Sequence, residues 1–531
     1  MTEKKIENLV ILLLIIFSIY CALINGAALD VPFEMRMGKE RLKYLFSLGA
    51  YSDYDFKDVR FYPGFYNTFS IFITKMFPAK YEIQIWSLIN LTFSFFTAVG
   101  IGKITEKLFN KKVGKIVFLL CFLNPIFFGH MSINCKDTII AFANVWLTYL
   151  LLRYFETQHL KRGNKYVFLA GLVLGLGAGV RIVFVATLIP LFFLLLLEIL
   201  FFKKIINSKF SVKKFCFDLI IVLAIAYFLI IAFWPHTHQN IIILPFKLFF
   251  ESLNFSFGWP WILFNGSYYF TDAVPKYYLI TNLLYKTPEF ILLSYAAFIY
   301  LFFSNKYFFT SQFNFFKTKI FFILFILIFP NLLIFINPYK LYDGLRLFLY
   351  LIPYLCIIPG LFIYYLFYNF KTKISKVFLL TISPFFLYYL FIFISLTPYH
   401  YTYLNILVGN YSEASKKFEN DYWAVSIKEL VKNISYEKSL LNTDKKVKMA
   451  FCGGHYKQTK PMLEAIKNFN FEAVDYRSEE YDYVIMTNRS QGDKNHELIE
   501  KVSSCFETFK GEDVISVKRN GLILSILRKK L

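Results

Sequence analysis

Long apolar runs separated by short polar connections dominate the first 396 residues of the chain. About eleven of these runs approach or reach the roughly 17 to 25 residues that an α-helix needs to cross a bilayer. They lie near residues 9–28, 83–102, 114–129, 138–152, 166–180, 182–202, 215–233, 289–304, 319–337, 345–368 and 376–396. The pattern predicts an all-α polytopic membrane domain over residues 1–396. We expect the first run to stay as an anchor, because no small-x-small cleavage site precedes Asp30.

The pattern of hydrophobic and polar positions changes after residue 428. Short runs rich in β-forming residues predict strands at 446–454, 471–476, 481–488 and 521–530, and amphipathic runs predict helices at 460–469 and 494–506. We therefore expect a small soluble α/β domain over residues 429–531, called the tail domain below. An outer-face segment at 397–428 joins it to the membrane domain.

Lysine and arginine residues cluster in alternate connections between the apolar runs, at 103–115, 153–165, 203–214, 306–319 and 371–376. Short loops rich in these residues stay on the cytoplasmic side of a membrane. The N-terminus is therefore predicted to lie inside. The first outer loop at 29–82, the turn at 130–137, the fourth outer loop at 234–288 and the tail domain are predicted to lie outside.

Composition agrees with a membrane protein, because 57% hydrophobic residues, a mean hydropathy of +0.49 and 66 Phe exceed what a soluble core can bury. The formal net charge of +22 is explained by contact with anionic lipids, and the sequence contains no nucleic-acid-binding module. Cys452 and Cys505 both fall in the tail domain, where a disulfide and two free thiols are equally compatible with the sequence.

Charged and polar side chains gather at the predicted outer ends of the apolar runs. An ionisable group at the centre of a membrane helix costs about 2.5 to 3.5 kcal/mol, so such groups usually have a purpose. The outer connections carry Asp30, Glu34, His130, Lys136, Asp137, Arg181, Asp343 and Arg346. Each one alone is compatible with a helix cap or with a cation that reaches the lipid headgroups. Together they suit a site where cations bind a lipid-linked phosphate and a carboxylate accepts a proton from a hydroxyl.

This face resembles the GT-C superfamily of polyprenyl-phosphate-dependent glycosyltransferases, in the branch that holds protein O-mannosyltransferases and the lipid A aminoarabinose transferase. The resemblance rests on the acid that opens the first outer loop and on YPGFYN at 62–67, GHMSINCKDTIIAFA at 129–143 and YDGLRLFLYLIP at 342–353. The segment PYHYTYLNILVGNYSEASKKFENDYWAVS at 398–426 is similar to a Pro-Tyr, Tyr-x-Asn and Asp-Tyr-Trp pattern of bacterial members. The resemblance covers the chain to about Ser426 and does not extend to the tail domain.

In this family the acid just after the first span is the catalytic base, which the resemblance assigns to Asp30. Mannosyltransferases usually carry adjacent Asp-Glu, whereas the next acid here is Glu34, so Glu34 is a second candidate. Asp137 resembles a second acid that positions the acceptor or binds a metal. Basic residues at the outer membrane boundary bind the donor phosphate in relatives, and the best matches are Arg181, Arg346 and Lys136.

Further side chains are expected to contact the substrates, namely His130, Asp53, Asp55, Asp343, Tyr62, Asp421 and Trp423. Asp53 and Asp55 also compete with Asp30 for the role of base. A divalent metal shared by Asp30 and Asp137 is compatible with the sequence, but no ligand spacing requires one. No motif requires another cofactor.

The resemblance predicts transfer of a sugar from a polyprenyl phosphate to a hydroxyl of a protein, lipid or glycan. The reaction would be an inverting displacement at the outer face of a bacterial inner membrane. Two other classes stay open. A transporter or flippase would be expected to show repeated halves with charges at mid-depth. A non-catalytic envelope-assembly protein would act without a sugar donor.

Overall fold

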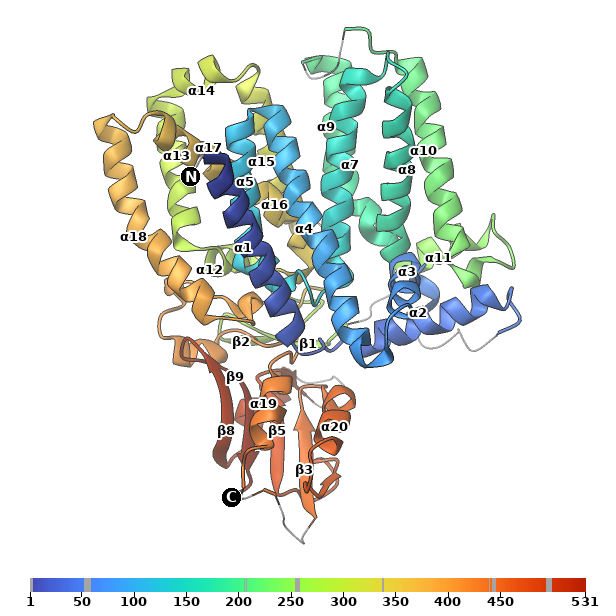
Figure 1. The fold of residues 1–531 in the computed structure, drawn as a ribbon, viewed down its shortest axis with the longest axis vertical. Helices are drawn as coiled ribbons and strands as arrows, with labels where there is room; N and C mark the ends of the chain where they lie inside the picture. The colour runs from blue at the N-terminus through green and yellow to red at the C-terminus, as the bar shows by residue number, and fades with distance from the viewer. Residues whose placement is uncertain are drawn as a thin grey trace.

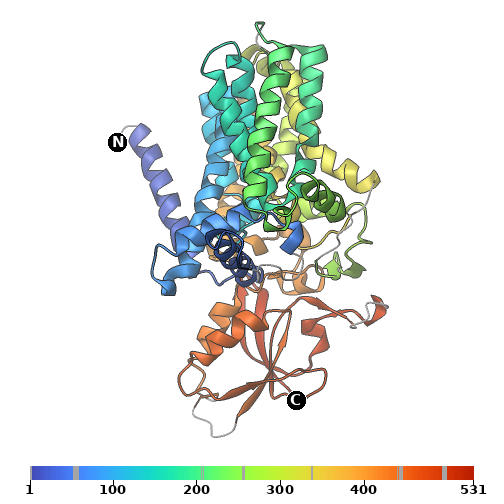
Figure 2. The same ribbon diagram turned by 90° about the vertical axis from the view of Figure 1, so that its right-hand side faces the viewer.

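The computed structural model describes residues 3–51, 59–204, 206, 208–253, 258–336, 339–438, 440–441, 446–492 and 499–531. Helices fill the upper part of the molecule, and a β sheet lies beneath them (Figure 1). The N-terminal helix α1 (Glu3–Ile24) stands at the side of the helix bundle, and the C-terminus lies with the sheet (Figure 2).

Nine helices among the described residues are long and apolar enough to cross a membrane. They comprise α1, α4 (Glu82–Leu108), α7 (Asp137–Thr157), α8 (Gly163–Val180), a run at 184–202 that contains α9 (Ile189–Leu197), α10 (Val212–Ala232), α15 (Phe316–Ile336), a run at 346–368 that contains α16 (Ile352–Leu355) and α17 (Ile357–Tyr368), and α18 (Lys373–Ser395). A helix satisfies its backbone hydrogen bonds internally, as a lipid environment requires. The chain is a multi-pass membrane protein with a mainly helical membrane domain.

Two of the predicted spans are not single helices long enough to cross a membrane in the structure. Run 114–129 is divided into α5 (Lys111–Phe122) and α6 (Pro125–His130), because Asn124 caps α6 and Pro125 occupies its first turn. Run 289–304 is the 16-residue helix α13 (Glu289–Ser304), which bends by 109° from α12 (Tyr278–Lys286). The sequence predicts about eleven spans, and the described residues contain nine helices of this length and composition, or ten with this bent pair. The short helix α14 (Lys306–Gln312) follows α13.

The first outer loop contains two helices beside the ends of the spans. Helix α2 (Val31–Phe46) runs below α8 and α10, and α3 (Phe65–Thr74) lies between α2 and the lower end of α8 (Figure 1). The residues that α2 buries repeat with helical spacing, as in Val31, Met35 and Leu42. The sequence did not suggest α2. The fourth outer loop contains α11 (Leu244–Leu253) and a hairpin of β1 (Trp261–Phe264) and β2 (Ser267–Phe270).

The tail domain contains a five-stranded sheet in the order β4-β3-β5-β9-β8. Its strands are β3 (Val447–Cys452), β4 (Phe471–Ala473), β5 (Tyr483–Thr487), β8 (Glu512–Arg519) and β9 (Leu522–Lys529). Strands β3, β4 and β5 are parallel, while β9 pairs antiparallel with both β5 and β8. Helices α19 (Ile427–Ile434) and α20 (Tyr456–Glu464) contact each other and pack on one face of the sheet. The α/β fold class predicted for this part of the chain is confirmed.

One predicted helix of the tail domain is wrong in its described part. Residues 499–506 form a short 3₁₀ turn, the strand β7 (Ser503–Ser504) and the start of α21 (Cys505–Thr508). Ser504 caps α21 in a capping box with Glu507, so the chain turns here instead of continuing a helix. Strand β7 pairs with β6 (Ser490–Gln491). Strand β8 was missed by the sequence analysis.

The two faces of the sheet meet different apolar surroundings. Met449, Ile485 and Leu524 belong to the same continuous core as the membrane helices. Cys452, Met486 and Phe509 belong to a separate cluster on the other side. Cys452 and Cys505 form a disulfide. The tail domain is thus packed directly against the membrane domain.

Candidate active site

Arg346 is the centre of a cluster of charged side chains at the place where α1 ends and α7 begins. Its Nη2 donates a hydrogen bond to Asp30 Oδ2 (2.7 Å), its Nε to Asp137 Oδ2 (3.0 Å) and its Nη1 to Asp343 Oδ2 (2.8 Å). The rigid fork of guanidinium donors allows one arginine to bind carboxylates from separate connections. The Arg346 side chain is 5% exposed, whereas that of Asp30 is 34% exposed. Asp30 is therefore the carboxylate of this cluster that an incoming molecule reaches most easily.

A tight turn before Arg346 aims its side chain into the cluster. Asp343 and Gly344 both adopt left-handed backbone conformations, with φ of +58° and +62°. For a residue other than glycine this conformation costs roughly 1–2 kcal/mol, and it persists where the surroundings hold the residue. The contact of the Asp343 carboxylate with Arg346, and a hydrogen bond from the Tyr278 hydroxyl to Gly344 O (3.2 Å), supply such contacts.

Asp30 occupies the N-cap position of α2, yet no capping hydrogen bond of its side chain is found within the described residues. Its carboxylate instead binds Arg346, and Oδ2 lies 3.9 Å from Lys136 Nζ. Glu34, one helical turn later, is fully buried and pairs with Lys136. Glu34 also accepts a hydrogen bond from Asn67 Nδ2. The two acids of this helix thus differ, because Asp30 is partly open and Glu34 is enclosed.

The side chain of Asn134 holds the turn at 130–137 in shape through hydrogen bonds within the turn. Asn134 Oδ1 accepts from the backbone N–H groups of Lys136 (3.1 Å) and Asp137 (2.9 Å), and Asn134 Nδ2 donates to Asp137 Oδ2 (3.1 Å). Asp137 lies in the first turn of α7, where the helix dipole favours a negative charge. Arg181, which ends α8, brings Nη1 to 3.7 Å from Asp137 Oδ1.

The aromatic ring of Tyr62 contacts both Lys136 and Arg181. The centroid of its ring lies 5.2 Å from Lys136 Nζ and 5.9 Å from Arg181 Cζ. The backbone carbonyl of Tyr62 accepts a hydrogen bond from Arg41, which is buried beneath the loop. A Cβ atom at Gly64 would collide with the Arg41 guanidinium, and Gly64 also has a φ of +86°. The glycine of YPGFYN is therefore required for this loop to close over Arg41.

The charges of the cluster fix the protonation of its members outside the spans. Burial raises the pKa of Asp30, but the positive charges of Arg346 and Lys136 outweigh this effect and lower it to about 2. Burial lowers the pKa of Lys136, but Glu34 and Asp30 raise it overall. Burial lowers the pKa of His130 to about 3. At neutral pH the site therefore holds an ionised Asp30, a charged Lys136 and a neutral His130.

The fold around this cluster is similar to that of a solved glycosyltransferase over nearly the whole chain. ArnT from Cupriavidus metallidurans bound to undecaprenyl phosphate matches with a TM-score of 0.50 and 10% identity, over 99% of this chain and 98% of that chain. ArnT in the apo state matches with a TM-score of 0.52 and 10% identity, over 98% and 97%. The chain has the GT-C fold. The fold expected from the sequence motifs is thus confirmed.

A second glycosyltransferase is similar at a lower level. The oligosaccharyltransferase AglB from Archaeoglobus fulgidus, in complex with an inhibitory peptide and a dolichol-phosphate, has a TM-score of 0.44 and 12% identity, over 90% of this chain and 69% of that chain. No family model and no curated protein matches the sequence.

Within this GT-C fold, the Asp-Tyr-Trp motif lies behind Arg346. The Trp423 ring centroid is 4.4 Å from Arg346 Cζ, and the Tyr422 hydroxyl hydrogen-bonds to His130 Nε2 (2.9 Å). The Asp421 carboxylate accepts hydrogen bonds from the backbone N–H groups of Val425 and Ser426 (2.9 Å each). The structure therefore brings Trp423 and His130 to the cluster and assigns Asp421 to the turn that follows it.

Two predicted residues, Asp53 and Asp55, lie outside the described residues. Among the described residues, no group of three or more His, Cys, Asp or Glu side chains is arranged to hold a metal ion. The carboxylates of Asp30 and Asp137 each face the Arg346 guanidinium, which lies between them. Within the described residues, these two carboxylates are therefore not arranged to share a metal ion.

Several residues of the site were missed by the sequence analysis. Arg489 of the tail domain lies 2.6 Å from Asp343 Oδ1 through Nη1, and it is 3.5 Å from Glu419 Oε2. A signal for Arg489 was present, because it comes directly after the predicted strand at 481–488. Polar residues at the carboxyl ends of parallel strands commonly form sites. Arg41 has no such signal, and Asn67 was marked only as the last residue of YPGFYN, since the roles of both depend on how α2 and α3 pack.

Proposed function

We propose that this protein is a membrane glycosyltransferase that moves a sugar from a polyprenyl phosphate to a hydroxyl of a protein, lipid or glycan acceptor. The observation that carries the proposal is the partly exposed Asp30 carboxylate bound to the buried Arg346, at the end of a membrane helix. The GT-C fold supports it, since ArnT was solved with undecaprenyl phosphate. In the proposed orientation the site faces the extracytoplasmic side of a bacterial inner membrane.

The donor phosphate would bind to the cations around Asp30. Arg346, Arg181 and Lys136 come from three different connections and converge on this carboxylate or on Asp137. Charge-assisted hydrogen bonds from arginine to phosphate are strong, and an arginine can share its donors between two anions. A phosphate held here would leave its hydrocarbon chain among the membrane helices. Asp137 and Asp343 would keep Arg346 oriented while this exchange takes place.

Asp30 would act as the base in a single displacement with inversion. The acceptor hydroxyl attacks the anomeric carbon, its proton moves to an Asp30 oxygen, and the bond from the anomeric carbon to the phosphate oxygen breaks. A carboxylate with a pKa of about 2 is a weak base. When Arg346 directs part of its charge to the donor phosphate, the pKa of Asp30 rises toward its ordinary value and proton transfer becomes easier.

The leaving phosphate requires no general acid. It departs as an anion that the cations already stabilise, unlike the leaving group in glycoside hydrolysis, where two carboxylates divide the work. Glu34 would hold Lys136 in place and would not transfer protons, because its oxygens already face Lys136 and Asn67. His130 would support the Asp-Tyr-Trp motif through Tyr422.

The test is transfer of labelled sugar by purified protein. A panel of polyprenyl-phosphate sugars is offered with envelope lipids, glycans and proteins as acceptors, and the Asp30→Asn protein serves as the inactive control. We expect label in one acceptor fraction together with an equal amount of free polyprenyl phosphate. Movement of intact donor across vesicle membranes without transfer would instead favour a flippase, and the absence of transfer from every donor would contradict the proposal.

A further inference from the structure

The tail domain inserts one charged side chain into the active site. Arg489 follows β5 and is 3% exposed, and its Nη1 donates to Asp343 Oδ1 (2.6 Å). The other carboxylate oxygen of Asp343 accepts from Arg346 (2.8 Å). Asp343 itself is 1% exposed. A buried carboxylate therefore links the arginine of the tail domain to the arginine at the centre of the site.

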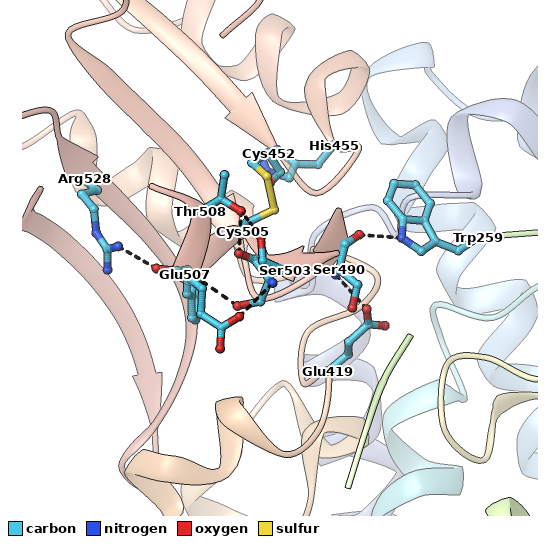
Figure 3. Close-up of a disulfide and its surroundings, with 12 residues drawn as sticks. Trp259, Glu419, Cys452, His455, Ser490, Ser503, Cys505, Glu507, Thr508 and Arg528 are labelled. Atoms are coloured by element: carbon cyan, nitrogen blue, oxygen red, sulfur yellow. Dashed lines mark hydrogen bonds between the residues drawn. A yellow bond between two sulfur atoms is a disulfide. The ribbon is translucent and has the colours of Figure 1, made fainter. Parts of the chain in front are cut away.

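The fourth outer loop and the outer-face segment both contact Arg489 or its neighbour Ser490. Arg489 Nη1 also donates to the backbone carbonyl of Tyr422 (3.1 Å), and its guanidinium lies 4.7 Å from the centroid of the Trp259 ring. Trp259 Nε1 donates to Ser490 O (2.8 Å), and Ser490 N donates to Glu419 Oε1 (2.8 Å), as Figure 3 shows. The backbone next to Arg489 is thus held by the fourth outer loop and by the outer-face segment.

The tail domain holds the same backbone from its own side. Cys505 N donates to Arg489 O (2.9 Å), and Ser490 pairs with Ser504 between β6 and β7. The disulfide connects Cys505 to Cys452 at the end of β3 (Figure 3). Contacts from both sides therefore hold the backbone at Arg489 and Ser490, which fixes the place where the Arg489 side chain enters the site.

The charge of Arg489 matters for Arg346. Asp30, Asp137 and Asp343 all face Arg346, so one positive charge meets three negative charges. Arg181 lies beside Asp137, Lys136 lies beside Asp30, and Arg489 lies beside Asp343. Without Arg489, the carboxylate of Asp343 would draw Arg346 more strongly to itself. Buried charges interact strongly, so this change would weaken the hold of Arg346 on any other anion.

We infer that Arg489 is a positioning residue for sugar transfer, which holds Asp343 and through it sets the orientation and free charge of Arg346. The tail domain is then part of the active site and not only an appended module. This inference rests on the proposed glycosyltransferase activity, with Arg346 as a ligand of the donor phosphate.

The test compares Arg489→Gln with Arg519→Gln in the full-length protein. Arg519 is a matched control, because it also ties the sheet to the outer-face segment, away from the site, through Thr397 O (2.8 Å), and it pairs with Glu429 Oε2 of the tail domain (2.6 Å). We expect Arg489→Gln to lower kcat about 100-fold, as small misplacements in active sites do, and Arg519→Gln to leave kcat close to the wild-type value. Arg489→Lys keeps the charge and should recover part of the lost activity.

A double-mutant cycle shows whether Arg489 acts through Asp343. Once Asp343→Asn has removed the carboxylate, adding Arg489→Gln should lower kcat little further, because residues in one network are not additive. Independent, multiplicative losses would overturn the inference, as would equal losses in Arg489→Gln and Arg519→Gln. If Arg489→Gln does not fold, the cycle is run with Arg489→Lys under the same criteria. An inactive wild-type protein would overturn the proposed function and this inference with it, whereas unaffected variants of an active wild-type protein would overturn this inference alone.

Discussion

The two ends of helix α7 both carry buried polar groups, but their surroundings differ. The helix is 21 residues long, which separates its ends by about 30 Å. At its start, Asp137 belongs to the ionic cluster around Arg346. At its end, the Tyr154 hydroxyl donates to Asp218 Oδ2 (2.6 Å), and Gln158 Nε2 donates to the same hydroxyl (3.0 Å).

The two networks differ in whether all of their polar groups are enclosed by the protein. At the end of α7, Gln158 exchanges hydrogen bonds with the backbone of Ser211, so the network closes between neighbouring helices. At the start, charges from distant parts of the chain meet and one carboxylate, that of Asp30, remains partly exposed. A network in which every polar group is buried and paired mainly fixes how the helices pack. Buried charged groups are energetically costly, and a cluster of them in which one side chain stays accessible to solvent is typical of functional sites.

The largest expected contrast is between Asp30→Asn and Asp218→Asn. The first change removes the proposed base, and we expect kcat to fall by roughly 10²–10⁴-fold, the usual contribution of general base catalysis. The second keeps an oxygen that accepts from Tyr154 and should leave kcat near the wild-type value. Both are measured as initial rates of labelled-sugar transfer with matched amounts of folded protein.

Binding of the donor separates chemistry from structure in this pair. Asp30→Asn should still bind polyprenyl phosphate, since it removes a negative charge that competes for Arg346. Full activity in Asp30→Asn would move the role of base to another acid, such as Asp137 or the undescribed Asp53 and Asp55. Equal losses in both variants would mean that the two ends of α7 do not differ in function.

An arginine pair sharpens the same comparison with a smaller expected effect. Lysine at position 346 keeps the charge, but its single nitrogen cannot bind Asp30, Asp137 and Asp343 in the geometry of the guanidinium fork. We expect Arg346→Lys to lower kcat/KM for the donor by about 10²–10³-fold, comparable to the loss of an oxyanion donor. Arg153 near the other end of α7 pairs with Glu156 (3.2 Å), so Arg153→Lys is the control and should remain active. Thermal unfolding of both variants shows whether a loss reflects unfolding, and equal kcat/KM in both would refute the role given to Arg346.

The two ends also differ in what the sequence could predict. The membrane helices follow from long apolar runs, and Asp30, Asp137 and Arg346 follow from motifs at the ends of those runs. Their contacts depend on packing between segments more than 200 residues apart, as in the hydrogen bond from Arg346 to Asp137. No local periodicity encodes such distances. At the other end of α7, neither the contact between Tyr154 and Asp218 nor the two residues themselves were predicted.

The tail domain shows the same limit in its second half. Strand β9 follows from an apolar run, but β8 (Glu512–Arg519) begins with two acidic residues and was missed. Its pairing with β9, and not its own pattern, makes it a strand. The helix expected at 494–506 fails in its described part because Ser504 ends the periodic run with a capping box. Arg489 could be suspected only from its place after a strand.

The smallest expected effect concerns pH. Because Asp30 has a depressed pKa of about 2 and His130 a pKa lowered to about 3, neither group changes charge near neutrality. The carboxylate is ionised above its folded pKa, so the free enzyme needs no further deprotonation as pH rises. We therefore expect the kcat/KM of the wild-type protein to lack an acid limb from these groups between about pH 5 and pH 8.

Removing the positive charge of Lys136 should make kcat/KM decline at acidic pH. Lys136 is one of the charges that lower the pKa of Asp30, so Lys136→Met should raise this pKa toward the ordinary aspartate value of about 4. The kcat/KM of this variant should then fall as pH decreases toward about 4, where protonation removes the base. The shape of the profile is the readout, because the loss of a phosphate ligand lowers activity at every pH without creating a limb. A limb near pH 6 in the wild-type protein would show that a different group carries the proton, and an unchanged profile in Lys136→Met would show that the charges around Asp30 do not control it.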